Sequence, residues 1–254
     1  MIAIIDYDTG NLRSVCNALD RIGAEYCLTD DPAVIAKADR VLLPGVGEAS
    51  SAMQKLQERG LCEVIKSLKV PVLGICIGMQ LMCRHSEEGD VDCLGIFDAD
   101  VRKFEADPAA GVKVPHMGWN TISDLRTDLF KGLGNLADME SGPSVLLSQS
   151  TCSGVESGSM SHGSDRCMSQ YSCSGVESGS ASLGSDLSMS QSSDVFVYFV
   201  HSFAASVCDD TIAVSENGRK FSAAMRKGNF YGAQFHPEKS GDVGEMILRN
   251  FMNL

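Results

Sequence analysis

The sequence is poor in basic residues and has no long apolar segment. It contains 21 Lys and Arg against 33 Asp and Glu, which gives a formal net charge of −12. Nucleic-acid surfaces and polybasic membrane patches need clustered Lys and Arg, so this balance argues against both. No apolar run approaches the roughly 18 residues that span a bilayer. The opening MIAIIDY has no positive segment before its apolar residues, so we expect a first buried strand there and not a signal peptide.

Signatures of metal and nucleotide binding are also missing. The ten cysteines include no CxxC pair and no Cys/His cluster with metal-ligand spacing. There is no Walker-type loop and no GxGxxG, and Thr9-Gly10-Asn11 is too short to indicate a flavin phosphate loop. Most cysteines lie within apolar or amphipathic patterns, where free Cys behaves as a small hydrophobe. We therefore expect no metal, no cofactor and a reducing cytoplasmic location.

Apolar runs alternate with helical patterns in the first part of the chain. Residues 2–7, 41–43 and 70–75 are short apolar runs typical of buried strands. Apolar residues at helical spacing lie between them, from Leu12 to Ile22 and from Met53 to Leu68. This alternation predicts an α/β fold, with parallel strands joined by right-handed crossovers.

The pattern changes after residue 94. Short segments separated by Gly, Asn or Asp are typical of antiparallel strands and hairpins, and they cover 96–104, 112–122, 195–203, 211–214, 221–226 and 230–235. The chain then ends in an amphipathic pattern, with Val243, Ile247 and Phe251 four residues apart, which predicts a final helix.

One stretch, at about 141–194, is rich in Ser and Gly and contains an internal repeat. STCSGVESGS begins at 150 and YSCSGVESGS at 171. Such a composition buries too little apolar surface to offset the entropy of ordering it. A β-solenoid is the alternative, but it needs at least about three repeats. We expect one domain over 1–254, interrupted by a flexible surface insertion, and assign no role to Cys152, Cys167 or Cys173.

Gly74-Ile75-Cys76-Ile77-Gly78 joins a predicted strand to a predicted helix. A nucleophile on a tight strand-to-helix turn needs small neighbours, because the backbone is strained and the side chain must project from it. The N-terminus of the following helix offers unpaired N–H groups and positive potential, which favour a reactive thiolate. The alternative is an ordinary buried cysteine at a strand end. We interpret Cys76 as a nucleophile.

Two further segments could complete a catalytic site. His236-Pro-Glu238 follows the last predicted strand, so Glu238 could accept a proton from one ring nitrogen of His236 while the other nitrogen faces the thiol. A lone His at a strand end is more often structural. Pro44-Gly45-Val46-Gly47 follows the strand at 41–43 and could direct backbone N–H groups at an oxyanion. An ordinary turn without a catalytic role would have the same sequence pattern.

Together these segments resemble the triad-type (class I) glutamine amidotransferases, whose nucleophile elbow and His-x-Glu are carried here by Cys76, His236 and Glu238. The resemblance covers the whole chain except the insertion. Finer motifs are similar to those of the glutaminase subunits of imidazole glycerol phosphate synthases. They are IDYDTGNLRSV from residue 5, PGVG from 44, GICIGMQL from 74, PHMGWN from 115, YFVHSF from 198 and FHPEKSG from 235.

The resemblance implies a flavodoxin-like open sheet, mostly parallel, with added antiparallel strands and hairpins and with helices on both faces. It implies hydrolysis of glutamine at Cys76 and ammonia transfer to a separate cyclase subunit, which makes imidazole glycerol phosphate and an aminoimidazole carboxamide ribotide in histidine biosynthesis. The oxyanion would be held by the amides of Gly47 and Ile77. The amino-acid end of the substrate would be held by Gln80 and the backbone of Ser202 and Phe203.

The resemblance also implies that Asn11, Trp119 and Lys239 lie near the partner. Trp119 is the only Trp and could equally be a core residue. His116 and His201 are expected to be structural. Phe203 stands where the family often has Tyr, and Ile77 replaces the usual Leu, a near-isosteric change.

Three other functions stay open on the sequence. The first is a glutaminase for another pathway, such as pyridoxal phosphate or purine synthesis. The second is a stand-alone γ-glutamyl hydrolase, and the third is a non-catalytic binding subunit that kept the fold. The intact Cys76, His236 and Glu238 argue against the third.

Overall fold

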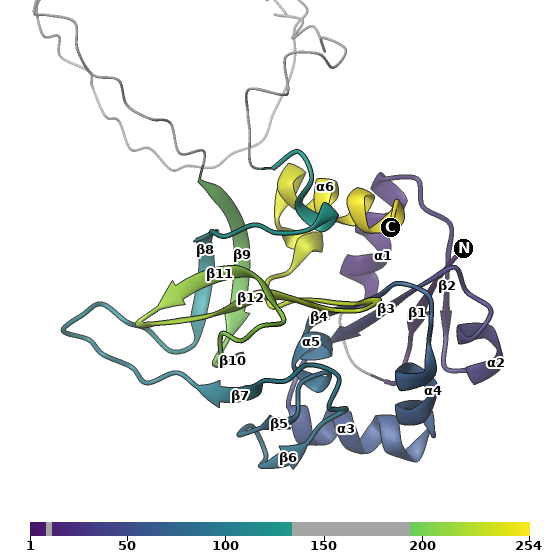
Figure 1. The fold of residues 1–254 in the computed structure, drawn as a ribbon, viewed down its shortest axis with the longest axis horizontal. Coiled ribbons are helices and arrows are strands. Elements are labelled where there is room, and N and C mark those ends of the chain that lie inside the picture. Colours follow the sequence, from purple (N-terminus) through teal and green to yellow (C-terminus); the bar gives the residue numbers. More distant parts are fainter. Residues whose placement is uncertain (9–11, 134–193) are drawn as a thin grey trace, which may run out of the picture. The chain divides into compact units, whose positions relative to one another are not determined.

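The computed structural model describes residues 1–8, 12–133 and 194–254. Its central element is a seven-stranded sheet with the order β11-β12-β13-β4-β3-β1-β2 (Figure 1). The five strands that pair in parallel are β1 (Ile2–Ile5), β2 (Tyr26–Thr29), β3 (Arg40–Gly45), β4 (Val72–Cys76) and β13 (Phe230–Ala233). Two strands extend the sheet in antiparallel fashion, β11 (Thr211–Asn217) and β12 (Arg219–Lys227). The predicted mixed α/β sheet is confirmed.

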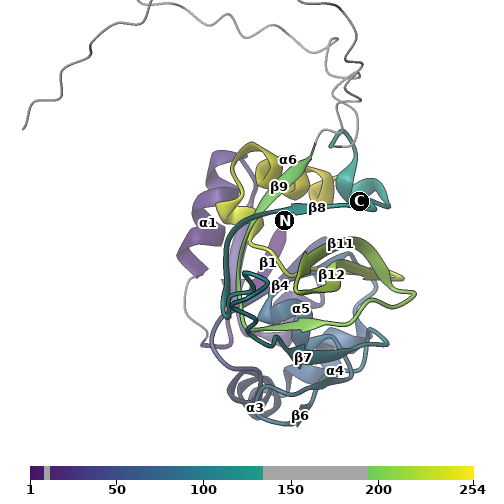
Figure 2. The ribbon, with the colours of Figure 1, turned by 90° about the vertical axis from the view of Figure 1, so that its left-hand side faces the viewer.

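Helices lie on both faces of this sheet (Figures 1 and 2). One face carries α1 (Leu12–Arg21) and α6 (Gly241–Met252), and the other carries α3 (Ala49–Glu58), α4 (Leu61–Ser67) and α5 (Ile77–Leu81). The short α2 (Pro32–Ile35) follows β2. The helical patterns predicted from apolar spacing bury the expected stripe, as Val15 and Leu19 of α1 show. Burial of such stripes provides most of the stability of these helices.

Two smaller sheets stand beside the carboxyl end of β4. The strands β8 (His116–Ile122) and β9 (Val195–His201) pair in antiparallel fashion. A four-stranded sheet has the order β10-β7-β5-β6 and consists of β10 (Phe203–Ala205), β7 (Asp100–Lys103), β5 (His85–Ser86) and β6 (Val91–Asp92). The described residues also form the 3-10 helices η1 (Asp128–Phe130) and η3 (Pro237–Lys239).

The strand predictions need two corrections. The segment 230–235 was expected among antiparallel strands, but β13 is antiparallel only to β12 and runs parallel to β4. Within 96–104 only Asp100–Lys103 forms a strand. In addition, β2 was not predicted, because it lies at the edge of the sheet with all four residues partly or fully exposed and gives no buried run.

The predicted insertion at about 141–194 lies outside the described residues, apart from residue 194, and so does Asn11. Over the described ranges no helix is long and apolar enough to cross a membrane. The same ranges contain no group of three or more His, Cys, Asp and Glu that could hold a metal ion.

Candidate active site

Three neighbouring parallel strands, β3, β4 and β13, bring the predicted catalytic segments to one edge of the sheet. Gly45 of β3 pairs with Cys76 of β4, and Ala233 of β13 pairs with Ile75. In open α/β sheets the carboxyl ends of parallel strands form the usual ligand-binding edge. The sheet order therefore explains how His236, which follows β13, reaches a cysteine far away in the sequence.

The backbone at Cys76 makes the predicted tight turn. Cys76 ends β4 with φ 54° and ψ −108°, and α5 begins at the next residue. Positive φ is strained for a residue with a side chain and is typical of functional turns. A Cβ on Gly78 would lie 1.7 Å from the Leu43 carbonyl oxygen, and one on Gly74 would lie 2.6 Å from the Gly78 carbonyl. The glycines around Cys76 are thus required by the close approach of α5 to β3 and β4.

Hydrogen bonds hold both the ring and the backbone of His236 in place. Its Nδ1–H donates a 2.8 Å hydrogen bond to Oε1 of Glu238, and both side chains are almost completely buried. The His236 backbone N–H donates to the Tyr198 carbonyl, and its carbonyl accepts from the Ser240 hydroxyl. The second ring nitrogen, Nε2, is buried without a hydrogen-bond partner among the described residues. It is therefore the nitrogen available for proton transfer.

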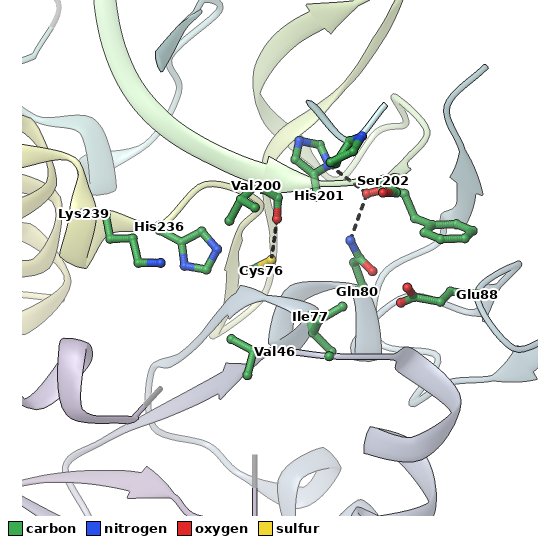
Figure 3. Close-up of a pocket in the computed structure, with 13 residues that line it drawn as sticks. Val46, Cys76, Ile77, Gln80, Glu88, Val200, His201, Ser202, His236 and Lys239 are labelled. Atoms are coloured by element: carbon green, nitrogen blue, oxygen red, sulfur yellow. Dashed lines mark hydrogen bonds between the residues drawn. The ribbon is translucent and has the colours of Figure 1, made fainter. Parts of the chain in front are cut away.

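The electrostatics of His236 favour its charged form. Burial alone would lower the pKa of the imidazole, but the neighbouring Cys76 and Glu238 outweigh burial and raise the pKa to about 9. Figure 3 shows the ring beside the Cys76 sulfur. A protonated imidazole next to a cysteine and steadied by a carboxylate is typical of a thiolate–imidazolium nucleophile.

A cavity of about 300 Å³ opens at this edge. All five residues predicted to bind substrate line it together with Cys76 and His236, namely Gly47, Ile77, Gln80, Ser202 and Phe203. Gly47 has φ 97°, a conformation that glycine adopts without strain. Ile77 opens α5, so its N–H belongs to the first helical turn, where N–H groups have no partner within the helix. Both residues therefore lie beside Cys76 on the wall of the cavity.

Gln80 lines this cavity, and its side chain has an unpaired acceptor. Its Nε2 donates to the Phe203 carbonyl and to Oε1 of Gln234, both at 3.0 Å. Its Oε1 is buried and has no partner among the described residues. An unsatisfied buried acceptor costs free energy until a ligand supplies a donor. The position therefore suits an ammonium or amide group of a bound molecule.

Two residues of the site were missed from the sequence. Glu88 lines the cavity, and its Oε2 accepts a 3.0 Å hydrogen bond from the Ala49 N–H, while burial raises the pKa of its carboxyl group. Gln234 is fully buried and donates to the Cys76 sulfur at 3.7 Å. Gln234 could have been found, because it lies two residues before His236 at the end of a predicted strand. Glu88 lies in a polar Glu-Glu-Gly segment that gives no such signal.

The three predicted interface residues have different outcomes. Trp119 is 57% exposed and Met117, two residues earlier on β8, is 62% exposed, so the core alternative for Trp119 is wrong. Lys239 is exposed and lines the cavity beside His236 (Figure 3). Asn11 is not among the described residues.

Comparison with known proteins identifies relatives over the whole chain. The family described as "Glutamine amidotransferase class-I" matches residues 3–142 and 145–254. The imidazole glycerol phosphate synthase subunit HisH of Bacteroides fragilis (strain YCH46) is 44% identical, with 100% of this chain and 99% of the relative covered. The subunit of the same name from Bacteroides thetaiotaomicron is 42% identical, with the same two coverages.

A solved glutamine amidotransferase has the same fold. It superimposes with a TM-score of 0.59 over 100% of this chain and 98% of its own, at 13% identity. At that identity the likeness speaks for the fold alone. The family match and the sequence relatives cover the whole chain at much higher similarity. They show that the chain belongs to the class-I glutamine amidotransferase family.

Proposed function

We propose that this chain is the glutaminase subunit of an imidazole glycerol phosphate synthase, with Cys76, His236 and Glu238 as its catalytic triad. Two relatives with that synthase name match over the full length at 44% and 42% identity. The observation that carries the chemistry is the buried His236–Glu238 hydrogen bond, with the free nitrogen of His236 beside Cys76.

The reaction follows from these positions. The Cys76 thiolate attacks the carboxamide carbon of glutamine, and the amides of Gly47 and Ile77 hold the oxyanion. His236 gives its Nε2 proton to the departing nitrogen, so ammonia leaves and a thioester forms at Cys76. His236 then takes a proton from water, which attacks the thioester, and glutamate leaves as the thiolate returns. Glu238 stabilises the imidazolium at each stage.

The amino-acid end of glutamine would be held on the far side of the cavity. The unpaired Oε1 of Gln80 and the carboxylate of Glu88 both line it and can accept hydrogen bonds from an α-ammonium group. The Phe203 carbonyl already accepts two hydrogen bonds, from Gln80 and from His201. A carbonyl oxygen has two lone pairs, so we assign this carbonyl to orienting Gln80, while Ser202 and the Phe203 backbone form the wall beside it.

Ammonia would pass to a cyclase subunit docked on the outer face of β8 and β9. That face exposes Met117, Trp119 and Phe196, and the Trp119 ring meets the Tyr198 ring edge-on with centroids 6.0 Å apart. A contiguous exposed apolar and aromatic surface is typical of an interaction site. Lys239 is exposed and lines the catalytic cavity, and Lys239 and Asn11 would lie near the same partner. Transfer inside a complex keeps ammonia unprotonated and nucleophilic.

The test is glutamate release by the full chain, alone and with a cyclase subunit and its phosphorylated ribulosyl aminoimidazole-carboxamide substrate. We expect slow release by the chain alone and a large stimulation by the loaded cyclase, with imidazole glycerol phosphate as product. The Cys76→Ala variant should bind the cyclase but release no glutamate. Release by Cys76→Ala at the wild-type rate would exclude the proposed triad.

The same assay separates the alternatives. A stand-alone γ-glutamyl hydrolase would be fully active without a partner. A glutaminase of pyridoxal phosphate or purine synthesis would be stimulated by the synthase subunit of that pathway and not by this cyclase. A non-catalytic binding subunit would release no glutamate under any of these conditions. The seven free cysteines of the described ranges suit a reducing compartment, and we place the enzyme in the cytoplasm.

A further inference from the structure

Strand β8 presents two different faces. Because successive side chains of a strand point to opposite sides, Met117 and Trp119 face outward while His116 and Asn120 face inward. The inner face packs against β9 and β12, where His116 stacks on Phe199 with ring centroids 4.9 Å apart and meets the Phe221 ring edge-on. One strand therefore carries both the exposed aromatic surface and a buried polar ring.

The inward groups form a continuous chain of hydrogen bonds. Nδ2 of Asn120 lies 3.1 Å from Nε2 of His116, and Nδ1 of His116 lies 3.0 Å from Nε2 of His201. Nδ1 of His201 lies 2.8 Å from the Phe203 carbonyl oxygen. The carbonyl can only accept, so His201 carries its proton on Nδ1 and accepts at Nε2. His116 then donates from Nδ1 and accepts the Asn120 N–H at Nε2.

This chain of bonds holds only while both rings are neutral. Burial lowers the pKa of His116, and it lowers the pKa of His201 to about 3. Both imidazoles therefore stay uncharged at neutral pH, with one donor and one acceptor each. The direction of all three hydrogen bonds is fixed by the tautomers.

The far end of the chain is the substrate site. The Phe203 carbonyl that accepts from His201 also accepts the 3.0 Å hydrogen bond from Nε2 of Gln80 (Figure 3). With its two lone pairs occupied, this carbonyl is fixed between His201 and Gln80. The position of the unpaired Oε1 of Gln80 is thus set through Phe203 by His201 and, one step further, by His116.

We infer that His116 and His201 are positioning residues for glutamine, which transmit the placement of β8 through the Phe203 carbonyl to Gln80. This inference rests on the proposed function. His201 lines the cavity, but the hydrogen bonds described for both rings lead to the Phe203 carbonyl, and so to Gln80, and not to Cys76 or His236. Since the outer face of the same strand carries Trp119, a partner that shifts β8 would also shift the substrate-binding amide. The sequence indicated only a structural role for these histidines.

Packing alone does not account for the two imidazoles. They lie among Phe104, Phe199 and Phe221, with His201 edge-on to Phe221 at 5.2 Å between centroids. A phenylalanine ring would fill the same apolar space at similar volume. The imidazoles differ from phenylalanine in making directed hydrogen bonds. A substitution that keeps an aromatic ring but removes these bonds therefore separates the packing role from the positioning role.

The experiment compares His116→Phe with His116→Asn in the full chain. The Asn variant keeps a donor near the position of Nδ1, whereas Phe keeps the ring and loses the donor. Each variant is treated separately with two reagents that modify Cys76, and the rate of modification at Cys76 is followed by mass spectrometry. Iodoacetamide needs only the reactive thiol, while the glutamine analogue diazo-oxo-norleucine must also be held at its amino-acid end. The KM and kcat for glutamine are measured in parallel.

For His116→Phe we expect modification by the analogue to slow, and KM to rise, by roughly 5- to 10-fold, the effect of one hydrogen bond. The iodoacetamide rate and kcat of His116→Phe should stay within about two-fold of the wild-type values. For His116→Asn, all four quantities should stay within about two-fold of the wild-type values. Equal analogue rates in wild type and His116→Phe would overturn the inference. A wild type that neither reacts with the analogue nor hydrolyses glutamine would instead overturn the proposed function.

A second pair of variants decides the matter if His116→Phe does not fold. His201→Asn keeps a donor near Nδ1 for the Phe203 carbonyl, and His201→Gln does not. We expect the analogue to modify His201→Gln several-fold more slowly than His201→Asn, with equal iodoacetamide rates. Equal analogue rates in this pair would contradict the positioning role.

Discussion

The Nδ1–H group of His236 donates to Oε1 of Glu238 over 2.8 Å, although only Pro237 separates the two residues. Pro237 begins the 3-10 helix η3, which turns the Glu238 side chain back under the ring. The bond fixes the tautomer of the neutral imidazole and leaves Nε2 toward Cys76. A local turn after β13 thus determines which ring nitrogen is left without a partner on the side of Cys76.

Replacing Glu238 by Gln tests this relationship. Gln keeps the shape of the side chain but removes the charge that stabilises the imidazolium, so we expect kcat for glutamine to fall by roughly 10²- to 10⁴-fold with little change in KM. Steady-state glutamate release measures both constants. The matched variant is Glu88→Gln, which should raise KM and leave kcat near wild type. The same pattern of change in both variants would contradict the separate roles.

The raised pKa of His236 gives a prediction about pH. Its pKa of about 9 results from Cys76 and Glu238 outweighing burial. Cys76→Ala removes the largest raising contribution, so the pKa of His236 should fall from its wild-type value, as should that in Cys76→Ser, whose hydroxyl stays neutral. Titration of the His236 ring by NMR measures the change. An unchanged pKa in Cys76→Ala would mean that the ring and the sulfur do not interact.

The close approach of α5 to β3 predicts that Gly78→Ala is severely destabilising. The new Cβ would meet the Leu43 carbonyl oxygen at 1.7 Å, and a backbone atom has little room to yield. We expect a loss of at least about 3 kcal/mol in the free energy of unfolding. Gly23→Ala is the control, because Gly23 has φ 70° but open space around it, so strain alone should cost about 1–2 kcal/mol. Denaturant unfolding that gives equal losses for both would refute the steric explanation.

The sequence pointed to the proposed triad because Cys76 and His236 each have a strong local signal. Gly74 and Gly78 flank Cys76 at the turn, and His236 follows directly on an apolar strand. These are requirements of the backbone, so they are visible without the fold. The parallel alignment of β13 with β4 was not visible, because apolar alternation does not distinguish parallel from antiparallel neighbours in a mixed sheet.

Residues whose role depends on distant contacts could not be predicted. Glu88 reaches the cavity because the β5–β6 turn lies against the start of α3, where it accepts from the Ala49 N–H. The pairing of His116 with His201 depends on the antiparallel register of β8 and β9, which places the two residues opposite each other. No pattern within either segment specifies that register, so both histidines looked merely structural.

The Ser- and Gly-rich segment gives a prediction from composition. It has too little apolar content to contribute a core, so deletion of residues 142–192 should leave glutamine hydrolysis and cyclase binding intact. The measurements are glutamate release and co-elution with the cyclase on a sizing column. Loss of either property in a deletion variant that still folds would show that the segment is more than a spacer.

The exposed aromatic face on β8 and β9 predicts how partner binding and catalysis can be separated. Trp119→Ala removes a large ring that is 57% exposed and edge-on to Tyr198, and truncation of such an anchor typically costs at least about 2 kcal/mol of binding free energy. We expect the Kd for the cyclase, measured by titration calorimetry, to rise at least about 30-fold. Glutamate release by the isolated variant should match that of the wild type, since Trp119 does not line the catalytic cavity.

Phe196→Ala, on the neighbouring strand of the same face, should weaken binding less if Trp119 is the central anchor. Unchanged affinity in both variants would move the docking surface away from this sheet.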